Sequence, residues 1–509
     1  MATVSSQPSV TVRPLPNGLA ASLVFLASGA VLVLETVSLR LVGPYVGTTL
    51  QVTSSVIGIA LAAIAYGAWF GGWLADRRDP RLLVAPALFV AGVATAVTLP
   101  LVRYAGEVLR GEAAAGILLL AALAVFPPAA LLSAVTPLVV KLQLGDLRRT
   151  GQVVGRLSGI GTLGGITATL GTGFVLVAAL PTSVIMVGLS VLLCGSGVAL
   201  AWYVRRQTIV LPVTRRTSAV VIVVGLAGVS FSTAAPTPCD VETAYHCAAV
   251  AADPDRPTGR LLLLNSAHHS YVDLADPTHL EFAYTRWIGA VVDLMAAPGV
   301  PVDAVHLGGG GFTMPRYLTA TRPGSRNTVF EIDGGLVELG KRELDVRPGP
   351  ELRPVVGDAR VLLSATPTDS ADLVVGDAFG HLVVPWHLAT REMIAQIRRV
   401  TRTGGIYVQN VIDYAPLRFI RAELATVAAE FGHVALVAPD AALRGTEGAN
   451  FLIIASDVPL ALDRLRDRLA SVSPEPVTLL TGSELAEFVG EAPVLTDDFA
   501  PVDQLLATG

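Results

Sequence analysis

Three acidic residues in the second half of the sequence lie where short apolar segments end. Glu331, Asp358 and Asp377 each close a segment that has the composition of a buried strand. The glycine run Gly308–Gly311 follows a fourth such segment, residues 302–307. The carboxyl ends of parallel strands meet at one edge of a sheet, and ligands bind beyond that edge. We therefore expect the three acids and the four glycines to form one site.

These residue types suit a nucleoside. Glycines let the backbone approach a ligand without a Cβ in the way, and an acid about 20 residues further on can accept hydrogen bonds from both ribose hydroxyls. Glu331 would fill this role, and Asp358 would hold an adenine amino group. A glycine run alone also fits a plain strand-to-helix turn, and Thr313 replaces the third glycine of the dinucleotide motif, which disfavours NAD. The three acids together favour nucleoside binding.

The segments that would position these residues alternate between strand and helix. We predict strands at residues 302–307, 328–331, 354–358, 372–377, 405–411, 434–438 and 451–456. Helical patterns separate most of them, which is typical of a doubly wound, Rossmann-like α/β sheet. The short linker between the last two strands predicts an antiparallel pair.

The first half of the chain has a different composition. The whole sequence is 52% hydrophobic and 15% charged, with a mean hydropathy of +0.60, and the apolar excess lies before about residue 235. Crossing a bilayer takes about 20 mostly apolar residues in a helix. We predict seven spans, near residues 18–40, 52–74, 82–103, 113–140, 153–180, 183–204 and 217–235. The fifth span is rich in glycine, which suits close helix packing; a glycine-lined substrate path is the alternative.

The predicted fold class is a multi-pass all-α membrane domain followed by an α/β Rossmann-like domain. We assign the domains as residues 1–236 for the membrane domain, 237–290 for a small β-rich subdomain, 291–457 for the Rossmann-like core and 458–509 for a C-terminal tail. The net charge of −5 gives no indication of a nucleic-acid partner.

The charges of the loops predict an orientation in the membrane. Basic residues follow the second, fourth and sixth spans, whereas the other loops hold few, so the positive-inside rule puts the N-terminus and these loops in the cytoplasm. With seven spans, the C-terminal domain would face outward. An enzyme that uses a cytosolic nucleoside would instead need a cytoplasmic domain, so the sequence leaves both sides open.

Two cysteines lie just after the last apolar run. If the domain faces outward, Cys239 and Cys247 emerge on the oxidising side, where disulfides persist. Eight positions along a straight strand are much too far apart for a bridge, so a disulfide requires a turn between them. Two unpaired small residues are the alternative.

Over roughly residues 240–457, the chain resembles the spermidine synthase family, and specifically its membrane-fused relatives. The matching segments are Glu242–His246 (Glu-Ser-x-Tyr-Gln in the family), Leu264–His269 (Leu-Asp-Gly-x-x-Gln), Gly308–Phe312 (Gly-Gly-Gly-Asp-Gly), Glu331–Asp333, Gly357–Ala359 and Val375–Gly380 (Asp-Ser-Ser-Asp-Pro). The resemblance implies the fold shared by spermidine synthases and AdoMet methyltransferases.

The resemblance also implies a role for each matching residue. The cofactor-binding residues would be Gly308, Gly309, Gly310, Gly311, Glu331, Asp358 and Ala359. Asp377 would be catalytic, accepting the proton of an attacking amine, which must be neutral to act as a nucleophile. Tyr245, His269 and Tyr284 would lie on the substrate side. The implied cofactor is S-adenosylmethionine or decarboxylated S-adenosylmethionine, used as a donor substrate.

Three departures from the family lie on the substrate side. Gly311 replaces the aspartate expected to meet the aminopropyl ammonium, Gly380 replaces the second acid of the catalytic motif, and Arg286 replaces the acid of a Tyr-His-Glu element. A site for a polyamine needs carboxylates at the spacing of its amines. We therefore expect little or no spermidine synthesis.

The sequence thus predicts a spermidine synthase-like transferase that is anchored in the cell membrane. Its acceptor would be a small molecule other than putrescine, and an amine is one candidate. An AdoMet-dependent methyltransferase is one alternative, and a non-catalytic sensor or half-transporter with a degenerate binding domain is another. The lipid bilayer is an expected partner, and a homo-oligomer is left open. We expect no metal, because the residues His268, His269, Asp273, Asp276 and His279 have no recognisable metal-ligand spacing.

Overall fold

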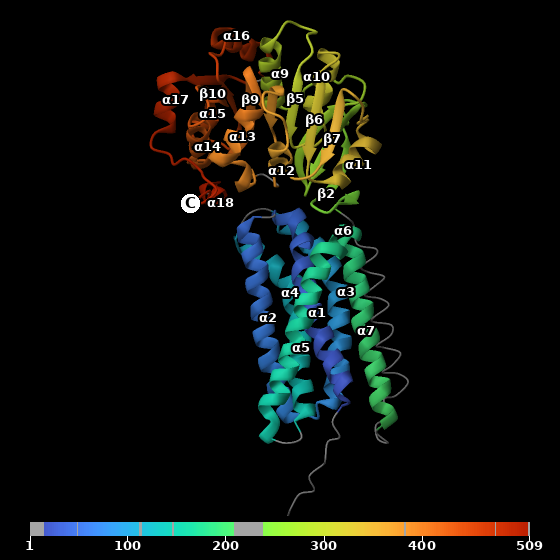
Figure 1. The fold of residues 1–509 in the computed structure, drawn as a ribbon. Helices are drawn as coiled ribbons and strands as arrows, with labels where there is room; N and C mark the ends of the chain where they lie inside the picture. The colour runs from blue at the N-terminus through green and yellow to red at the C-terminus, as the bar shows by residue number, and fades with distance from the viewer. Residues whose placement is uncertain are drawn as a thin grey trace, which may run out of the picture. The chain divides into compact units, whose positions relative to one another are not determined.

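The computed structural model describes residues 15–47, 49–110, 114–144, 147–207, 238–380, 383–473 and 475–506. The chain divides into two compact units, Met1–Pro238 and Cys239–Gly509. The described part of the first unit is helical, and the second unit combines strands and helices (Figure 1). This arrangement confirms the predicted fold class.

Six helical segments in the described part of the first unit are long and apolar enough to cross a membrane. They are α1 (Asn17–Val46), α2 (Leu50–Arg77), α3 (Arg81–Val108), α4 (Ala114–Gln143), the continuous run of α5 (Thr150–Gly171), a π-helical turn (Thr172–Leu176) and α6 (Val177–Ala179), and α7 (Thr182–Gln207). They coincide with the first six predicted spans. The seventh, near residues 217–235, lies outside the described residues.

Small residues let these helices approach each other closely. A Cβ added at Gly67 of α2 would lie 2.1 Å from the carbonyl oxygen of Ala130 in α4. A Cβ added at Gly164 of α5 would lie 2.4 Å from the carbonyl oxygen of Phe25 in α1. Gly161 and Gly165 line a cavity of about 580 Å³ together with side chains of α1 and α4. Close packing thus accounts for part of the glycine content of the fifth span.

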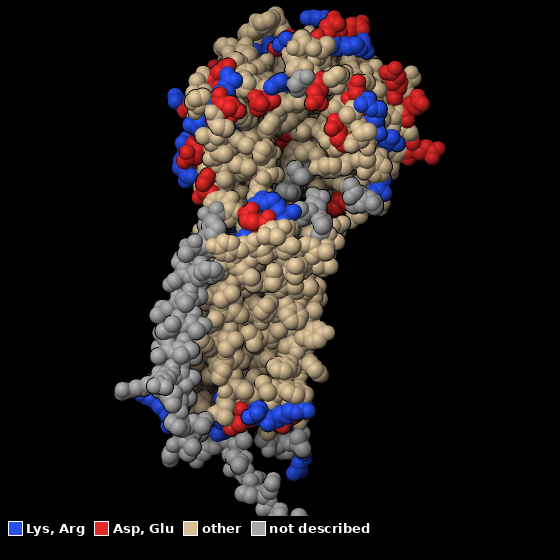
Figure 2. All heavy atoms as spheres, turned by 180° about the vertical axis from the view of Figure 1, so that it is seen from behind, with Lys and Arg blue, Asp and Glu red and all other residues tan. Residues whose placement is uncertain are grey.

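Basic residues gather at one end of the helical unit. Figure 2 shows Lys and Arg at this end, whereas the visible side of the helices is almost without charge. Arg77, Lys141 and Arg205 lie in the last turns of α2, α4 and α7. Lys141 Nζ also forms an ion pair with Asp76 Oδ1 at 2.7 Å, which joins the ends of α2 and α4.

The second unit contains an eight-stranded mixed sheet with the order β12-β10-β11-β9-β8-β5-β6-β7. The strands are β5 (Asp303–Leu307), β6 (Arg326–Glu331), β7 (Leu352–Val356), β8 (Ala371–Gly376), β9 (Thr401–Asp413), β10 (His433–Pro439), β11 (Ala449–Ser456) and β12 (Val477–Thr481). Strands β5 to β9 pair in parallel, whereas β10 pairs antiparallel with both β11 and β12. The pairing of β10 with β11 is the predicted antiparallel pair.

The strand β12 has no counterpart among the strands predicted from the sequence. It adds to β10 at the edge of the sheet, with Leu436 opposite Leu480. Its Val-Thr-Leu-Leu-Thr sequence has good strand propensity. With five residues, however, β12 is too short for its hydrophobic periodicity to distinguish a strand from a helix.

Helices cover both faces of the large sheet (Figure 1). One face packs against α9 (Ala283–Met295), α10 (Thr313–Thr321) and α16 (Leu462–Val472). The other packs against α12 (Ala359–Ser364), α13 (Arg391–Val400), α14 (Arg418–Ala428) and α17 (Gly482–Val489). Alternation along β8 sends Leu373 and Val375 to the first face and Val374 to the second, as expected for a strand buried on both sides.

A four-stranded antiparallel sheet precedes the large one. Its strands are β1 (Val241–Glu242), β2 (Cys247–Ala252), β3 (Gly259–Leu264) and β4 (Ala267–Asp273), in that order. Its apolar side chains share a core with Phe312 and with α11 (Gly334–Glu343). The small sheet is therefore fixed beside the glycine turn that follows β5.

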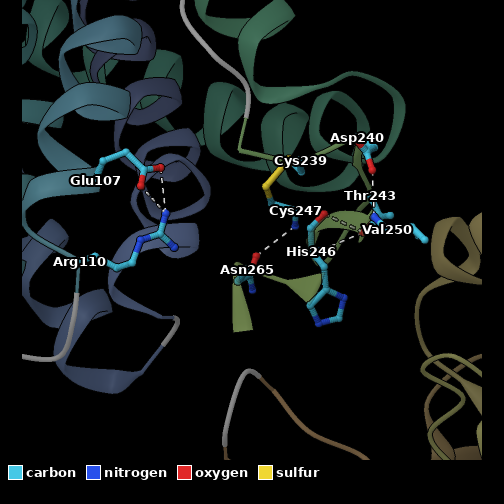
Figure 3. Close-up of a disulfide and its surroundings, with 9 residues drawn as sticks. All are labelled: Glu107, Arg110, Cys239, Asp240, Thr243, His246, Cys247, Val250 and Asn265. Carbon is cyan, nitrogen blue, oxygen red and sulfur yellow. Dashed lines mark hydrogen bonds and ion pairs between the residues drawn. A yellow bond between two sulfur atoms is a disulfide. The ribbon is translucent and has the colours of Figure 1, made fainter. Parts of the chain in front are cut away.

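A disulfide joins Cys239 to Cys247, with their Cα atoms 5.3 Å apart (Figure 3). The chain turns between β1 and β2, where the backbone N–H of His246 donates to Thr243 Oγ1 at 2.8 Å. The N–H of Cys247 donates to Asn265 Oδ1 at 3.0 Å. The sequence predicts that a disulfide would require a turn between the two cysteines, and the structure contains both the turn and the disulfide.

Candidate functional site

A cavity lies at the carboxyl ends of β5, β6, β7 and β8. Of the residues predicted for the site, its lining includes Gly308, Gly309, Gly310, Glu331, Asp358, Ala359, Asp377 and His269. The parallel pairing of these four strands brings together groups that are up to 69 positions apart, Gly308 and Asp377 being the furthest, and His269 joins them from β4 of the small sheet. The cavity is therefore the candidate site.

The glycine turn that follows β5 depends on the absence of side chains. Gly308 and Gly310 have φ angles of +98° and +48°, in the left-handed region that favours glycine. A Cβ at Gly308 would also lie 2.4 Å from the carbonyl oxygen of Asp377. The turn therefore brings bare backbone to the cavity and to the end of β8.

Glu331, the last residue of β6, is bound by the backbone of two loops. Its Oε2 accepts hydrogen bonds from the N–H groups of Gly309 at 2.8 Å and Gly310 at 3.3 Å, and its Oε1 accepts one from Asp333 at 2.9 Å. Burial raises the pKa of Glu331, and the three backbone N–H groups oppose that rise. The carboxyl group is thus held in one orientation at the wall of the cavity.

Asp358 follows β7 and caps the next helix. Its Oδ1 accepts hydrogen bonds from the N–H groups of Arg360 at 2.9 Å and Val361 at 3.2 Å, which begin α12. Its Oδ2 lies 2.9 Å from Nε2 of His387, which also lines the cavity. The sequence gives no signal for His387, because it lies 29 positions away and outside every motif.

Asp377 follows β8 and is surrounded by neutral hydrogen-bond donors. The hydroxyl of Tyr284 donates to Oδ2 at 3.1 Å, and the amide of Asn410 donates to Oδ1 at 2.9 Å. Asn450 in turn donates to Oδ1 of Asn410 at 2.9 Å. Burial raises the pKa of Asp377 to about 6, although both donors lower it. A carboxylate with such a pKa can take up and release a proton near neutral pH.

Comparisons with known proteins show what the C-terminal unit is similar to. No protein-family model matches the chain. A polyamine aminopropyltransferase from Vibrio vulnificus is 27% identical over 217 residues, which make up 40% of this chain and 70% of that protein. The C-terminal unit is spermidine synthase-like.

Two solved structures are similar to the same part of the chain. A probable spermidine synthase from Corynebacterium glutamicum is 29% identical, with a TM-score of 0.48, and covers 50% of this chain and 95% of its own. The spermidine synthase from Thermotoga maritima is 14% identical, with a TM-score of 0.32, and covers 52% of this chain and 81% of its own.

The spermidine synthase-like unit also holds a His–Asp pair at the cavity. His246 Nδ1 lies 3.0 Å from Oδ2 of the fully buried Asp333, and His246 lines the cavity. Thr243 donates its hydroxyl to the same carboxylate. Burial by itself would raise the pKa of Asp333, but the hydrogen bonds from His246 and Thr243 bring it below its usual value. His246 occupies the position of the glutamine in the family's Glu-Ser-x-Tyr-Gln motif, so this motif could have identified it as a site residue.

The remaining predicted residues lie in different surroundings. Tyr284 is buried and reaches Asp377, whereas Tyr245 is 50% exposed and is not part of the cavity lining. Gly311 lies behind the lining, where its N–H donates to Ser270 Oγ at 3.0 Å. Arg286 donates to the carbonyl oxygen of Leu280 at 2.7 Å. Of the residues predicted for catalysis and for the substrate side, His269 and Asp377 therefore line the cavity.

Proposed function

We propose that the spermidine synthase-like unit binds an S-adenosyl-type nucleoside and transfers a group from it to a small acceptor. The observation that supports this function best is that Glu331, Asp358 and Asp377 line one cavity beside the glycine turn. The similarity to a polyamine aminopropyltransferase supports transfer chemistry.

The nucleoside would bind between β6 and β7. Glu331 would accept hydrogen bonds from the ribose hydroxyls, for which its fixed orientation is suited. Asp358 would accept a hydrogen bond from the adenine amino group through Oδ2, which lies beside His387, while Oδ1 caps α12. Ile332 and Leu388 add apolar surface to the lining, which suits the flat face of a base.

Asp377 would act as the general base. As the neutral acceptor atom attacks the carbon bound to the donor's sulfonium, the carbon–sulfur bond breaks and its electrons return to sulfur. The proton of the acceptor passes to the carboxylate of Asp377. Tyr284 and Asn410 would position that carboxylate, since each donates to a different oxygen.

The acceptor would differ from putrescine. In the described part of the chain, the carboxyl groups that line the cavity are Glu331, Asp358 and Asp377, and the first two belong to the nucleoside side. Gly380, at the family's second acid, forms a backbone bridge with Val383. A second ammonium group would therefore lack a carboxylate partner, which favours an acceptor with a single reactive amine or another small nucleophile.

Calorimetry of the full-length chain in detergent, with methylthioadenosine as the ligand, tests nucleoside binding. We expect saturable binding by the natural chain and weaker binding by Asp358→Asn. Asp369→Asn is the matched control, because Asp369 lies in a turn before β8 and not in the cavity lining. The absence of binding by the natural chain would contradict the proposed function.

We also propose that the chain is membrane-anchored; its charges and its disulfide favour a spermidine synthase-like unit outside the cytoplasm, whereas the use of a cytosolic nucleoside favours the cytoplasmic side. The basic end of the helical unit supports a cytoplasmic position for the end of α7. The apolar run near residues 217–235 would then return the chain to the outer side. The disulfide between Cys239 and Cys247 is of the kind that persists in an oxidising compartment.

A further inference from the structure

Ser270 occupies the space beside the glycine turn where a longer side chain would have to fit. A Cβ added at Gly311 would lie 2.8 Å from Ser270 Cβ, and one added at Gly310 would lie 2.6 Å from Ser270 Oγ. Ser270 is buried, and its hydroxyl oxygen accepts the N–H of Gly311. An aspartate at position 311 would therefore collide with β4. The packing of β4 against the glycine turn thus leaves no room for a carboxylate at position 311.

The groups that take the place of a carboxylate at position 311 can donate hydrogen bonds. His269, the neighbour of Ser270 on β4, lines the cavity, and its Nδ1 lies 3.6 Å from the position of a Cβ at Gly310. The hydroxyl of Ser270 retains a hydrogen to donate, because its oxygen acts as the acceptor for Gly311. The wall of the cavity beside Gly310 thus combines an imidazole and bare backbone, and the Ser270 hydroxyl lies directly behind this turn.

The three lining carboxylates have other partners. Glu331 accepts three backbone N–H groups, Asp358 caps α12 and faces His387, and Asp377 accepts Tyr284 and Asn410. A primary ammonium group has donors only and needs acceptors around it, whereas a carboxylate needs donors. The side of Gly310 that faces His269 and Ser270 therefore suits a negatively charged group better than an ammonium group.

We propose that this subsite, formed by His269, Ser270 and the turn at Gly310, binds the carboxylate of the donor's amino-acid tail. The donor would then be S-adenosylmethionine itself in preference to its decarboxylated form. This inference rests on the proposed nucleoside binding and deepens it, because it selects the donor. It also favours methyl transfer over aminopropyl transfer, since aminopropyl transfer uses the decarboxylated tail.

Three unreactive ligands test the subsite by calorimetry on the full-length chain. S-adenosylhomocysteine and S-adenosyl-3-thiopropylamine share the adenosine, the thioether and the amine, and differ only in the carboxylate. Methylthioadenosine lacks the whole tail. We expect S-adenosylhomocysteine to bind about tenfold or more tightly than its decarboxylated counterpart, the scale of one charged hydrogen bond. Equal or tighter binding of the decarboxylated compound would overturn the inference.

Methylthioadenosine separates this inference from the function on which it rests. If all three ligands fail to bind, the nucleoside site is wrong and the inference falls with it. If methylthioadenosine binds but the carboxylate brings no gain, only the tail subsite is wrong.

Two substitutions locate the effect. His269→Gln, which installs the residue of the family motif, and Ser270→Ala should each reduce the preference for S-adenosylhomocysteine by about fivefold or more. Binding of methylthioadenosine reports whether each variant is folded. His268→Gln is the matched control, because His268 is the exposed neighbour on β4 and is not part of the lining. A preference that survives both substitutions would overturn the assignment of these residues.

Discussion

At the scale of single residues, the surroundings of Asp377 determine how the proposed reaction should depend on pH. Because burial raises its pKa to about 6, the carboxyl is protonated below that pH and cannot accept a proton. We expect turnover to rise as the pH increases through about 6. Asp377→Asn should lower turnover about 100-fold or more, the usual effect of losing a general base. The pH profile of initial rates and the affinity for methylthioadenosine would be measured in parallel. A similar loss of affinity would indicate a binding role instead.

Glu331 provides a second prediction at the same scale. Glu331→Gln keeps the size of the side chain but replaces one oxygen, which accepts backbone N–H groups, by a donor. We expect adenosyl ligands to bind more weakly by roughly 1–3 kcal/mol. Glu338→Gln on the exposed side of α11 is the control. Unchanged affinity in a folded Glu331→Gln variant would remove Glu331 from the site.

The glycines at positions 311 and 380 predict the outcome with a polyamine precursor. With no carboxylate at either position, putrescine has no anchor for its second ammonium group. We expect the purified full-length chain to form little or no spermidine from putrescine and decarboxylated S-adenosylmethionine. Chromatographic assay of the product measures this directly, and rapid turnover would show that these glycines do not exclude polyamines.

At the scale of secondary-structure elements, a buried acid links α14 to β9. Gln409 Nε2 donates to Glu423 Oε1 at 2.7 Å, and burial raises the pKa of Glu423 to about 8. The folded unit therefore keeps a proton on Glu423 at pH values where the unfolded chain, with an ordinary pKa near 4.5, has lost it. Between these two values the free energy of unfolding should fall as pH rises, by up to about 1.4 kcal/mol per pH unit.

Thermal unfolding of the full-length chain at pH 5.5 and 8 tests this contribution. Glu423→Gln cannot lose a proton, so its unfolding temperature should fall less between the two pH values than that of the natural chain. Glu484→Gln, at an exposed position in α17, should behave like the natural chain. The same decrease in all three proteins would mean that Glu423 does not supply the pH dependence.

At the scale of the whole molecule, the two cysteines of the disulfide report the side of the membrane. The chain has three cysteines, so a Cys194→Ala variant leaves only Cys239 and Cys247. A membrane-impermeant thiol reagent applied to intact cells should label the protein only after reduction. That result would support an outward, bridged unit. Labelling that requires lysis but no reductant would place the unit in the cytoplasm.

Some features of this protein depend only on neighbouring residues and can be predicted from the sequence. Six spans and the strands that end at Glu331 or just before Asp358 and Asp377 follow from local composition and periodicity. The turn at Gly308–Gly311 follows from residues that are adjacent in the chain. Local patterns fix these elements because each is stabilised by contacts or backbone preferences within a few positions.

Tertiary structure alone decided which residues meet. Tyr284 and Asn410 reach Asp377 from 93 and 33 positions away, and Ser270 reaches Gly311 from 41. The strand order puts β8 between β5 and β9, so Asp377 lies next to the glycine turn on one side and next to Asn410 on the other. A single sequence shows that these groups exist but not which strands become neighbours, because strand pairing is a choice among distant segments that only the packed sheet resolves.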